Sequence, residues 1–126
     1  MANTPTFNDK IRVKMDLYAH HAYEICKKLP ANEKFGLISQ LRRASTSVIL
    51  NFLEGFARRK PKVFLNFLEI SFGSLKESQY ILLFLKDEGL IQEAVFIDIS
   101  AEGDEIAAML WTLIQKIEQA CTRSTP

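Results

Sequence analysis

The sequence predicts an all-α protein that folds as an antiparallel, up-down-up-down four-helix bundle. Apolar residues recur at steps of three and four along most of the chain, and no segment shows the alternation of a β-strand. Helix breakers are few and well spaced: Pro30, Pro61, Gly89 and Gly103. Helices of similar length joined by tight turns form such a bundle. We expect a single domain over residues 1–126, with helices at about 9–29, 33–59, 61–88 and 92–120.

The first two helices are predicted from apolar stripes on either side of Pro30. The apolar residues of the first helix are spaced alternately by four and three residues, as in a coiled coil. They are Ile11, Met15, Tyr18, Ala22, Ile25 and Leu29. Pro30 ends this helix, because the residue before a proline is pushed out of the α region. Asn32 is placed to cap the second helix. The stripe of the second helix is Leu37, Leu41, Ala44, Val48 and Phe52.

The last two helices are bounded by Pro61 and Gly89. Pro61 suits the first turn of a helix, where its missing N–H would have no partner, and Gly89 is a natural left-handed helix end. The stripe of the third helix is Phe64, Leu68, Ser71, Leu75, Ser78, Leu82 and Leu85. The stripe of the fourth is Phe96, Ile99, Gly103, Ile106, Leu110, Leu113 and Ile117. Gly103 makes the helix about 1 kcal/mol less stable than alanine would. A kink or break near residues 100–103 is therefore an alternative to one continuous fourth helix.

The second and third helices carry more apolar surface than one core requires. The surplus residues lie beside the stripes, where a bundle helix is normally polar. Exposed apolar patches of this size mark interfaces, so we expect self-association rather than scattered exposed side chains. The expected oligomer interface is Ile38, Ile49, Leu53, Phe56, Val63, Ile70, Ile81 and Phe84.

Composition restricts the class of protein without giving its function. The chain has 126 residues, of which 48% are apolar and 25% charged, as in an ordinary globular domain. No apolar run approaches the roughly 20 residues that span a bilayer, and the first residues lack the apolar core of a signal peptide. We therefore expect a cytoplasmic protein with no membrane partner. Its two cysteines cannot form a disulfide framework.

Charge is distributed unevenly along the sequence. Residues 1–62 contain 12 Lys and Arg against 5 Asp and Glu, whereas residues 63–126 contain 4 against 10. The balances of +7 and −6 add to the net charge of +1. Seven carboxylates lie between Asp87 and Glu105 with no Lys or Arg among them. Such asymmetry fits a polyanion-binding edge, self-complementary subunits, or simply two different solvated faces.

The second helix also presents a line of polar residues beside its apolar stripe. If this line is buried, every member needs a hydrogen-bond partner, and Arg43 needs a carboxylate. An antiparallel third helix would place Glu77 opposite Arg43 and Ser74 opposite Ser47. We interpret the line as a structural network that fixes helix register, with a ligand or catalytic cleft as the alternative. The members of this network are Gln40, Arg43, Ser47, Asn51, Glu54, Ser74 and Glu77.

Neither metal binding nor catalysis is indicated by the sequence. A di-metal bundle requires Glu-x-x-His spacings, and the chain has none. Its only histidines, His20 and His21, are adjacent and diverge by about 100° around a helix. The chain also lacks a phosphate-binding glycine-rich loop and a credible nucleophile–histidine set. We expect no cofactor, no metal and no enzymatic activity.

The second and third helices resemble a family of four-helix-bundle proteins encoded in intervening sequences of bacterial 23S rRNA genes. The matching residues are Pro30, Glu33, Gly36, Leu37, Gln40, Arg42, Arg43, Ala44, Ser47, Val48, Asn51, Glu54, Gly55, Phe64, Phe67, Leu68, Gly73, Ser74, Leu75 and Glu77. The family usually has an Ile-Ala pair where Phe52 and Leu53 follow Asn51, and Ala at Ser71. The resemblance implies a left-handed bundle that forms homopentamers and has no established activity.

The chain is also similar to the basic accessory subunit of diversity-generating retroelements, a pentamer that binds nucleic acid and a reverse transcriptase. This similarity suggests an oligomeric scaffold or adaptor that binds RNA or DNA. The alternative is a protein-interaction or structural bundle with no nucleic-acid partner, and a small-molecule enzyme comes third. The near-neutral net charge speaks against strong phosphate binding. The expected nucleic-acid contacts are the turn residues Arg58, Arg59, Lys60 and Lys62, helped by Lys34 and Arg42.

Overall fold

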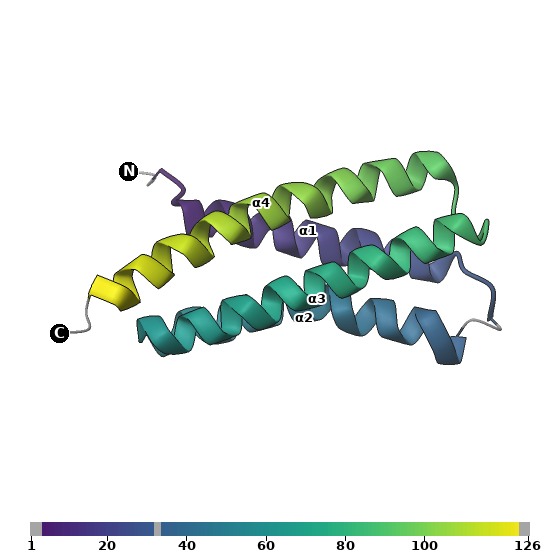
Figure 1. Cartoon of the computed structure of the whole chain (residues 1–126). Helices are drawn as coiled ribbons and strands as arrows, with labels where there is room; N and C mark the ends of the chain where they lie inside the picture. The colour runs from purple at the N-terminus through teal and green to yellow at the C-terminus, as the bar shows by residue number, and fades with distance from the viewer. Residues whose placement is uncertain (1–3, 32–33, 124–126) are drawn as a thin grey trace.

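The described part of the chain forms four long helices (Figure 1). The computed structural model describes residues 4–31 and 34–123, and for residues 34 and 35 it describes the backbone alone. The elements are α1 (Phe7–Lys27), a short kinked segment η2 (Lys34–Ile38), α2 (Ser39–Arg58), α3 (Pro61–Asp87) and α4 (Glu93–Arg123). The described residues contain no β-strand, which confirms the all-α class.

Consecutive helices run in opposite directions, as Figure 1 shows. Each helix packs against two neighbours: α1 and α3 both contact α2 and α4. The contact between α2 and α3 is the most extensive of these, and that between α1 and α4 is the least. This arrangement is that of a four-helix bundle. The left-handed sense stays a prediction.

Helix α1 begins at Phe7, two residues before the predicted start, because Thr6 caps it. The Thr6 hydroxyl accepts a hydrogen bond from the Asp9 N–H at 3.1 Å, and the Asp9 carboxylate accepts one from the Thr6 N–H at 3.0 Å. This reciprocal capping box satisfies two backbone donors of the first turn. The hydrogen bonds from Thr6 also hold the pKa of the Asp9 carboxyl below its usual value.

The start of the second helix differs from the prediction. A continuous helix from about residue 33 is wrong, because Gly36 has φ −111° and ψ −105°, outside the helical region. Glycine is the residue that most readily leaves helical backbone. Regular α-helix therefore begins only at Ser39. The predicted cap Asn32 lies outside the described residues.

The two turns that flank α3 follow the sequence signals. Arg59 ends α2 in the left-handed conformation, with φ +66°, and Pro61 occupies the first turn of α3. Gly89 ends α3 with φ +74°. The Leu90 N–H donates to the Leu85 carbonyl at 2.9 Å, and the Gly89 N–H to the Lys86 carbonyl at 3.0 Å. This pair of bonds is a Schellman motif.

Helix α4 is continuous from Glu93 to Arg123, so the break considered near residues 100–103 is not present. Gly103 is buried, and a Cβ at this position would lie 2.8 Å from Gln79 Nε2. Gln79 donates from Nε2 to Asp104 Oδ1 at 3.0 Å. Gly103 therefore provides space for a side chain of α3 within an unbroken helix.

The core lies along the predicted stripes. Its largest fully buried side chains include Tyr18, Phe52, Leu75 and Leu110. Tyr18 lies within 2.7 Å of Ser78 Oγ, which itself donates to the Leu75 carbonyl at 2.7 Å. The tyrosine hydroxyl is therefore the donor, and it links α1 to α3 across the bundle. Burial raises the pKa of Tyr18 to about 12, because a charged phenolate would lose its hydration inside the bundle.

Within the described part of the chain, no helix combines the length and the apolar character that crossing a bilayer requires.

Candidate functional site

Three members of the predicted polar network form a short chain of hydrogen bonds between α2 and α3. Asn51 Nδ2 donates to Ser47 Oγ at 2.7 Å and to the Ser47 carbonyl at 2.8 Å. Ser47 Oγ lies 2.8 Å from Ser74 Oγ. All three side chains are half-buried. Because these groups satisfy one another, the arrangement fixes the register of α2 against α3.

Arg43 and Glu77 also meet across this helix pair, but at the surface. Arg43 Nη2 lies 3.4 Å from Glu77 Oε2. The side chains are 69% and 44% exposed, so the expectation of a buried ion pair does not hold in the single chain. The helical periodicity placed Arg43 on the correct side of α2 but carried no information about depth. An exposed pair of this kind contributes at most about 1 kcal/mol.

The two ends of the predicted network are not joined to its centre. Gln40 is exposed, and Glu54 is exposed and accepts a hydrogen bond from Arg58 of its own helix. The predicted line is therefore a central cluster with separate surface residues at either end. The interpretation of this line as a structural network stays a prediction.

Sequence reasoning missed the buried hydrogen bonds of the serines on the α3 stripe. Ser71 is fully buried and donates to the Val48 carbonyl of α2 at 2.6 Å. Ser78 is fully buried and bonds to Tyr18 as described above. The sequence did contain a signal for these bonds, because Ser71 and Ser78 are polar residues in an apolar stripe of α3 that otherwise consists of Leu and Phe.

The turn between α2 and α3 exposes its four cations to solvent, but they are not equivalent. Arg58 pairs with Glu54, and its guanidinium lies 5.8 Å from the centre of the Phe67 ring. Lys60 and Lys62 form no ion pair with any described residue. The lysines therefore provide most of the charge that is available for an anion at this turn.

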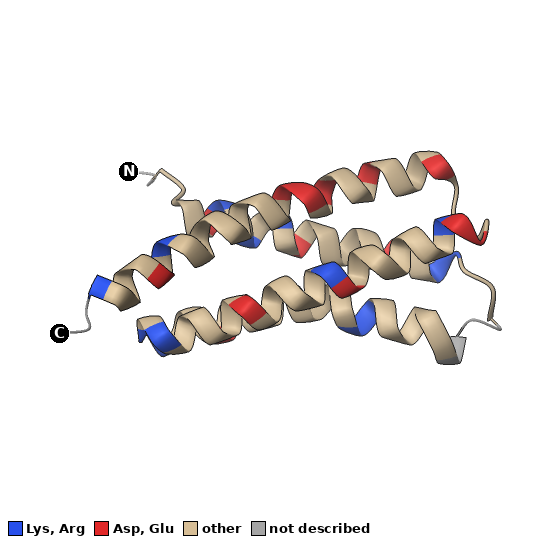
Figure 2. Cartoon of the chain, viewed as in Figure 1, with Lys and Arg blue, Asp and Glu red and all other residues tan. Residues whose placement is uncertain are grey.

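Two further cations of the acidic half of the sequence lie at the same end of the bundle. Figures 1 and 2 place the C-terminal end of α4 beside the N-terminal end of α3. Arg123 belongs to the last turn of α4, and Lys116 lines a groove together with Phe64 from the first turn of α3. Counting charge along the sequence could not find these residues, because only the antiparallel topology brings them to the turn.

Arg42, in contrast, lies far from the turn that it was expected to help. It precedes Arg58 by 16 residues on α2, which is about 24 Å along the helix axis. Its guanidinium lies 5.2 Å from the centre of the Tyr23 ring of α1. The expectation that Arg42 joins the basic turn is therefore wrong. The backbone of Lys34 also lies before α2, away from the turn, and its side chain is outside the described part.

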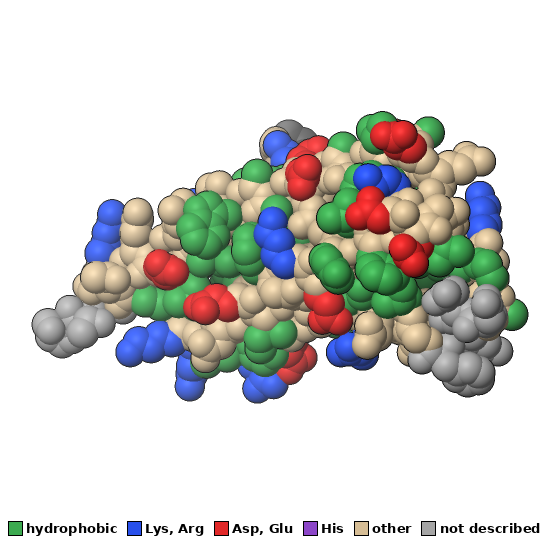
Figure 3. All heavy atoms as spheres, turned by 45° about the vertical axis from the view of Figure 1, so that its right-hand side comes forward, with side chains coloured by type: hydrophobic (Ala, Val, Ile, Leu, Met, Phe, Trp, Pro, Cys, Tyr) green, Lys and Arg blue, Asp and Glu red, His purple; other side chains and the backbone are tan. Residues whose placement is uncertain are grey.

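Half of the predicted interface residues are exposed apolar side chains, namely Leu53, Phe56, Ile70 and Phe84. Ile49 and Val63 are half-buried. Ile38 and Ile81 are only 4% exposed and belong to the core, so their assignment to the interface is wrong. Ile38 and Ile81 lie next to the apolar stripes on their helices, so side chains of neighbouring helices cover them. Figure 3 shows hydrophobic patches separated by charged side chains on the face turned to the viewer.

The described residues contain no group of three or more His, Cys, Asp or Glu side chains placed to hold a metal ion. His20 Nε2 lies 3.4 Å from Asp16 Oδ1 on the exposed face of α1. His21 Nδ1 lies 2.7 Å from Glu102 Oε1 and ties α1 to α4. Lys14 forms a second ion pair between these helices, with Glu105. The histidines are thus placed in surface pairs with carboxylates.

Both the sequence and the fold of this chain are similar to those of known proteins. The model of the 23S rRNA-intervening sequence protein family matches residues 10–112. No curated protein matches the chain. The fold is similar to the crystal structure of a protein of unknown function from the S23 ribosomal protein family of Bacteroides thetaiotaomicron VPI-5482, with a TM-score of 0.81. That similarity, at 23% sequence identity, covers 87% of this chain and 99% of the other.

The family match extends from α1 into α4 and so includes the polar cluster, the basic turn and most of the core. It therefore includes part or all of each of the four helices. The chain belongs to the 23S rRNA-intervening sequence protein family.

Proposed function

We propose that this protein is a non-catalytic, self-associating scaffold that binds RNA or another polyanion at the basic end of its bundle. The observation that carries the proposal is the gathering of cations from two distant parts of the sequence at one end. These cations are Arg58, Arg59, Lys60, Lys62, Lys116 and Arg123. Lysine and arginine side chains that neutralise phosphates release counterions, which favours binding without sequence specificity.

A single copy of this site is weak, so the proposal includes self-association. Leu53, Phe56 and Ile70 are between 42% and 53% exposed on α2 and α3, where a second copy would cover them. A head-to-tail contact that closes produces a ring, and we propose a homopentamer after the family resemblance. Repetition of a weak site around such a ring raises the overall affinity through avidity.

Fluorescence anisotropy with a labelled fragment of 23S rRNA tests the nucleic-acid part of the proposal. We expect binding that weakens steeply between about 50 and about 200 mM salt. The variant Lys60→Gln/Lys62→Gln should bind more weakly and with a lower salt slope, because it removes two phosphate contacts per subunit. The control variant Lys27→Gln/Lys28→Gln loses the same charge at the opposite end and should bind like the wild type.

Light scattering tests the self-association part separately. The wild type should have a mass several times the 14.4 kDa of the chain at micromolar concentration. Phe56→Ser/Ile70→Ser should shift the equilibrium toward the monomer, whereas Ile97→Ser, an equally exposed position on α4, should not. A wild-type monomer at these concentrations contradicts the proposed assembly.

The second candidate is a protein-interaction bundle with no nucleic-acid partner. The net charge of +1 and the internal pairing of Arg58 favour it. It is the conclusion to draw if the wild type binds no RNA at low salt but self-associates through α2 and α3.

A further inference from the structure

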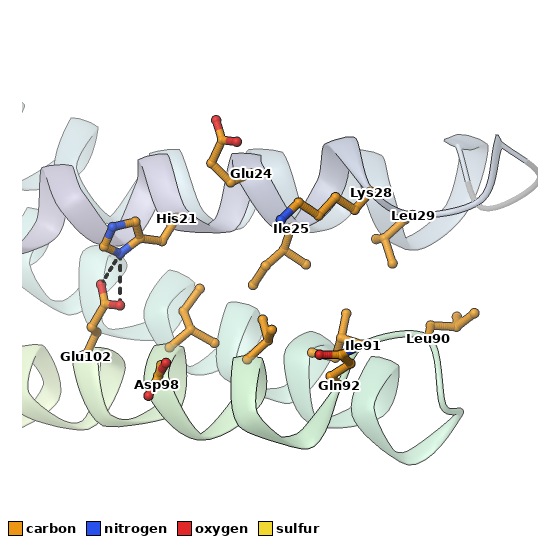
Figure 4. Close-up of a pocket in the computed structure, with 12 residues that line it drawn as sticks. His21, Glu24, Ile25, Lys28, Leu29, Leu90, Ile91, Gln92, Asp98 and Glu102 are labelled. Atoms are coloured by element: carbon orange, nitrogen blue, oxygen red, sulfur yellow. Dashed lines mark hydrogen bonds and ion pairs between the residues drawn. The ribbon is translucent and has the colours of Figure 1, made fainter.

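A groove of about 510 Å³ lies between the C-terminal half of α1 and the N-terminal half of α4 (Figure 4). Its floor is apolar and includes Ile25, Leu29 and Ile99, which are buried, and Val95, which is 39% exposed. Leu90 and Ile91 from the α3–α4 turn close one end. Its volume lies within the range of small-molecule sites.

The rim of the groove is predominantly acidic. Glu24, Asp98 and Glu102 lie on it, against one lysine, Lys28, and the imidazole of His21. Two of these carboxylates already have partners, since Glu24 pairs with Lys27 and Glu102 with His21. Glu24 also points away from the groove in Figure 4.

Asp98 differs from these two carboxylates because it has no hydrogen bond or ion pair with any residue that the structure describes. It lies one residue before Ile99 of the apolar floor. No Lys or Arg occurs on its own helix before Lys116. An unpaired carboxylate beside an apolar surface favours a ligand that carries both a positive charge and an apolar body.

We propose that this groove binds a small organic cation, with its apolar body on the floor and its ammonium group beside Asp98. Burial of the apolar body provides the affinity, and the carboxylate fixes the orientation of the ligand. Glu102 lies one helical turn further along α4 and adds to the negative potential. The groove is on the opposite side of the bundle from the α2–α3 surface, so the proposal does not depend on the proposed function.

The class of ligand can be tested with four probes on the full chain. Tryptamine carries an aromatic body and an ammonium group, indole-3-acetate carries the same ring with a negative charge, tryptophan is the zwitterion, and spermidine is a cation without an apolar body. We expect saturable binding of tryptamine in calorimetry. In NMR spectra of the protein, tryptamine should cause the largest changes in amide chemical shift at residues of the groove. The other three probes should bind more weakly.

Matched variants locate the site. Asp98→Asn should weaken tryptamine binding by about three- to fivefold, the range of an exposed charge pair, whereas Glu118→Gln makes the same charge change at the far end of α4 and should have no effect. Val95→Ser should weaken binding, and Ile97→Ser, an exposed apolar position outside the groove, should not. Lys28→Gln should tighten binding, because it removes the opposing charge.

Several results would overturn the proposal. Equal or tighter binding of indole-3-acetate or tryptophan would show that the groove does not select cations. Equal binding of spermidine, unaffected by Val95→Ser, would show that the apolar floor takes no part. Absence of saturable binding by any probe, in a protein whose circular dichroism spectrum is helical, would remove the site altogether.

Discussion

Gly55 provides a direct test of how closely α2 and α3 approach. A Cβ added at this position would lie 2.6 Å from Phe67 Cβ and 3.0 Å from Phe64 Cδ1, both in α3. The Phe67 Cβ is bonded to the backbone and cannot rotate away. Restoring an ordinary contact of 3.4 Å therefore requires the helices to separate locally by about 0.8 Å.

The expected effect of Gly55→Ala follows from two opposing contributions. Overpacking of this kind costs about 1 to 3 kcal/mol, and alanine gains about 1 kcal/mol over glycine in helix propensity. Because the clash involves rigid atoms, we expect a net loss of about 1 to 2 kcal/mol in the free energy of unfolding. Urea unfolding followed by circular dichroism measures it, with the protein concentration held constant.

Gly73 is the matched control for this experiment. It lies in α3, is exposed, and has no atom within 4 Å of an added Cβ. Gly73→Ala should therefore show only the propensity gain and stabilise the protein by about 1 kcal/mol. If Gly55→Ala proves as stable as Gly73→Ala, the two helices are not in contact at this point and the packing described here is incorrect.

Three further predictions concern single interactions. Arg43→Met should cost no more than about 1 kcal/mol in thermal unfolding of the dissociated chain, because its pair with Glu77 is exposed; a loss of about 3 kcal/mol would indicate a buried pair. Stability of the wild type should fall as the pH rises from about 10, the unfolded pKa of Tyr18, to about 12, its folded value, by up to about 1.4 kcal/mol per pH unit. The sign follows because the folded state retains the phenol proton in this range while the unfolded chain loses it. Tyr18→Phe should remove this part of the pH dependence, and an unchanged profile would place the ring in water. Thr6→Ala should lower stability by about 1 kcal/mol through loss of the α1 cap, and an unchanged melting temperature would mean that the cap does not form.

The core could be predicted from the sequence because burial follows helical periodicity. Positions such as Met15, Val48 and Leu110 are dictated by steps of three and four, and no tertiary information is needed to place them inside. The turns at Pro61 and Gly89 were equally predictable, since each depends on the conformational preference of one residue.

Two properties could not be predicted from periodicity, namely how deeply a side chain is buried and which side chain of another helix it contacts. Periodicity gives the direction of Arg43 around α2 but not its distance from solvent, which depends on the neighbouring side chains. The role of Gly103 depends on Gln79 of another helix, so helix propensity alone suggested a break that α4 does not have. The residue Gly36, where the helix does break, carried the same local signal as Gly103. Tertiary packing decided between them.

The antiparallel topology also changes what the charge asymmetry of the sequence means. The halves of the sequence do not become halves of the molecule, because α1 lies against α4 and its Lys14 and His21 pair with Glu105 and Glu102. Some cationic residues of the first half of the sequence therefore pair with carboxylates of the second half within one chain, between neighbouring helices. Lys60 and Lys62 in the α2–α3 turn and Asp98 near the start of α4 form no ion pair with any described residue. We propose that this one nearly neutral chain uses the lysines of the turn for an anion, Asp98 for a small organic cation and the apolar α2–α3 surface for self-association.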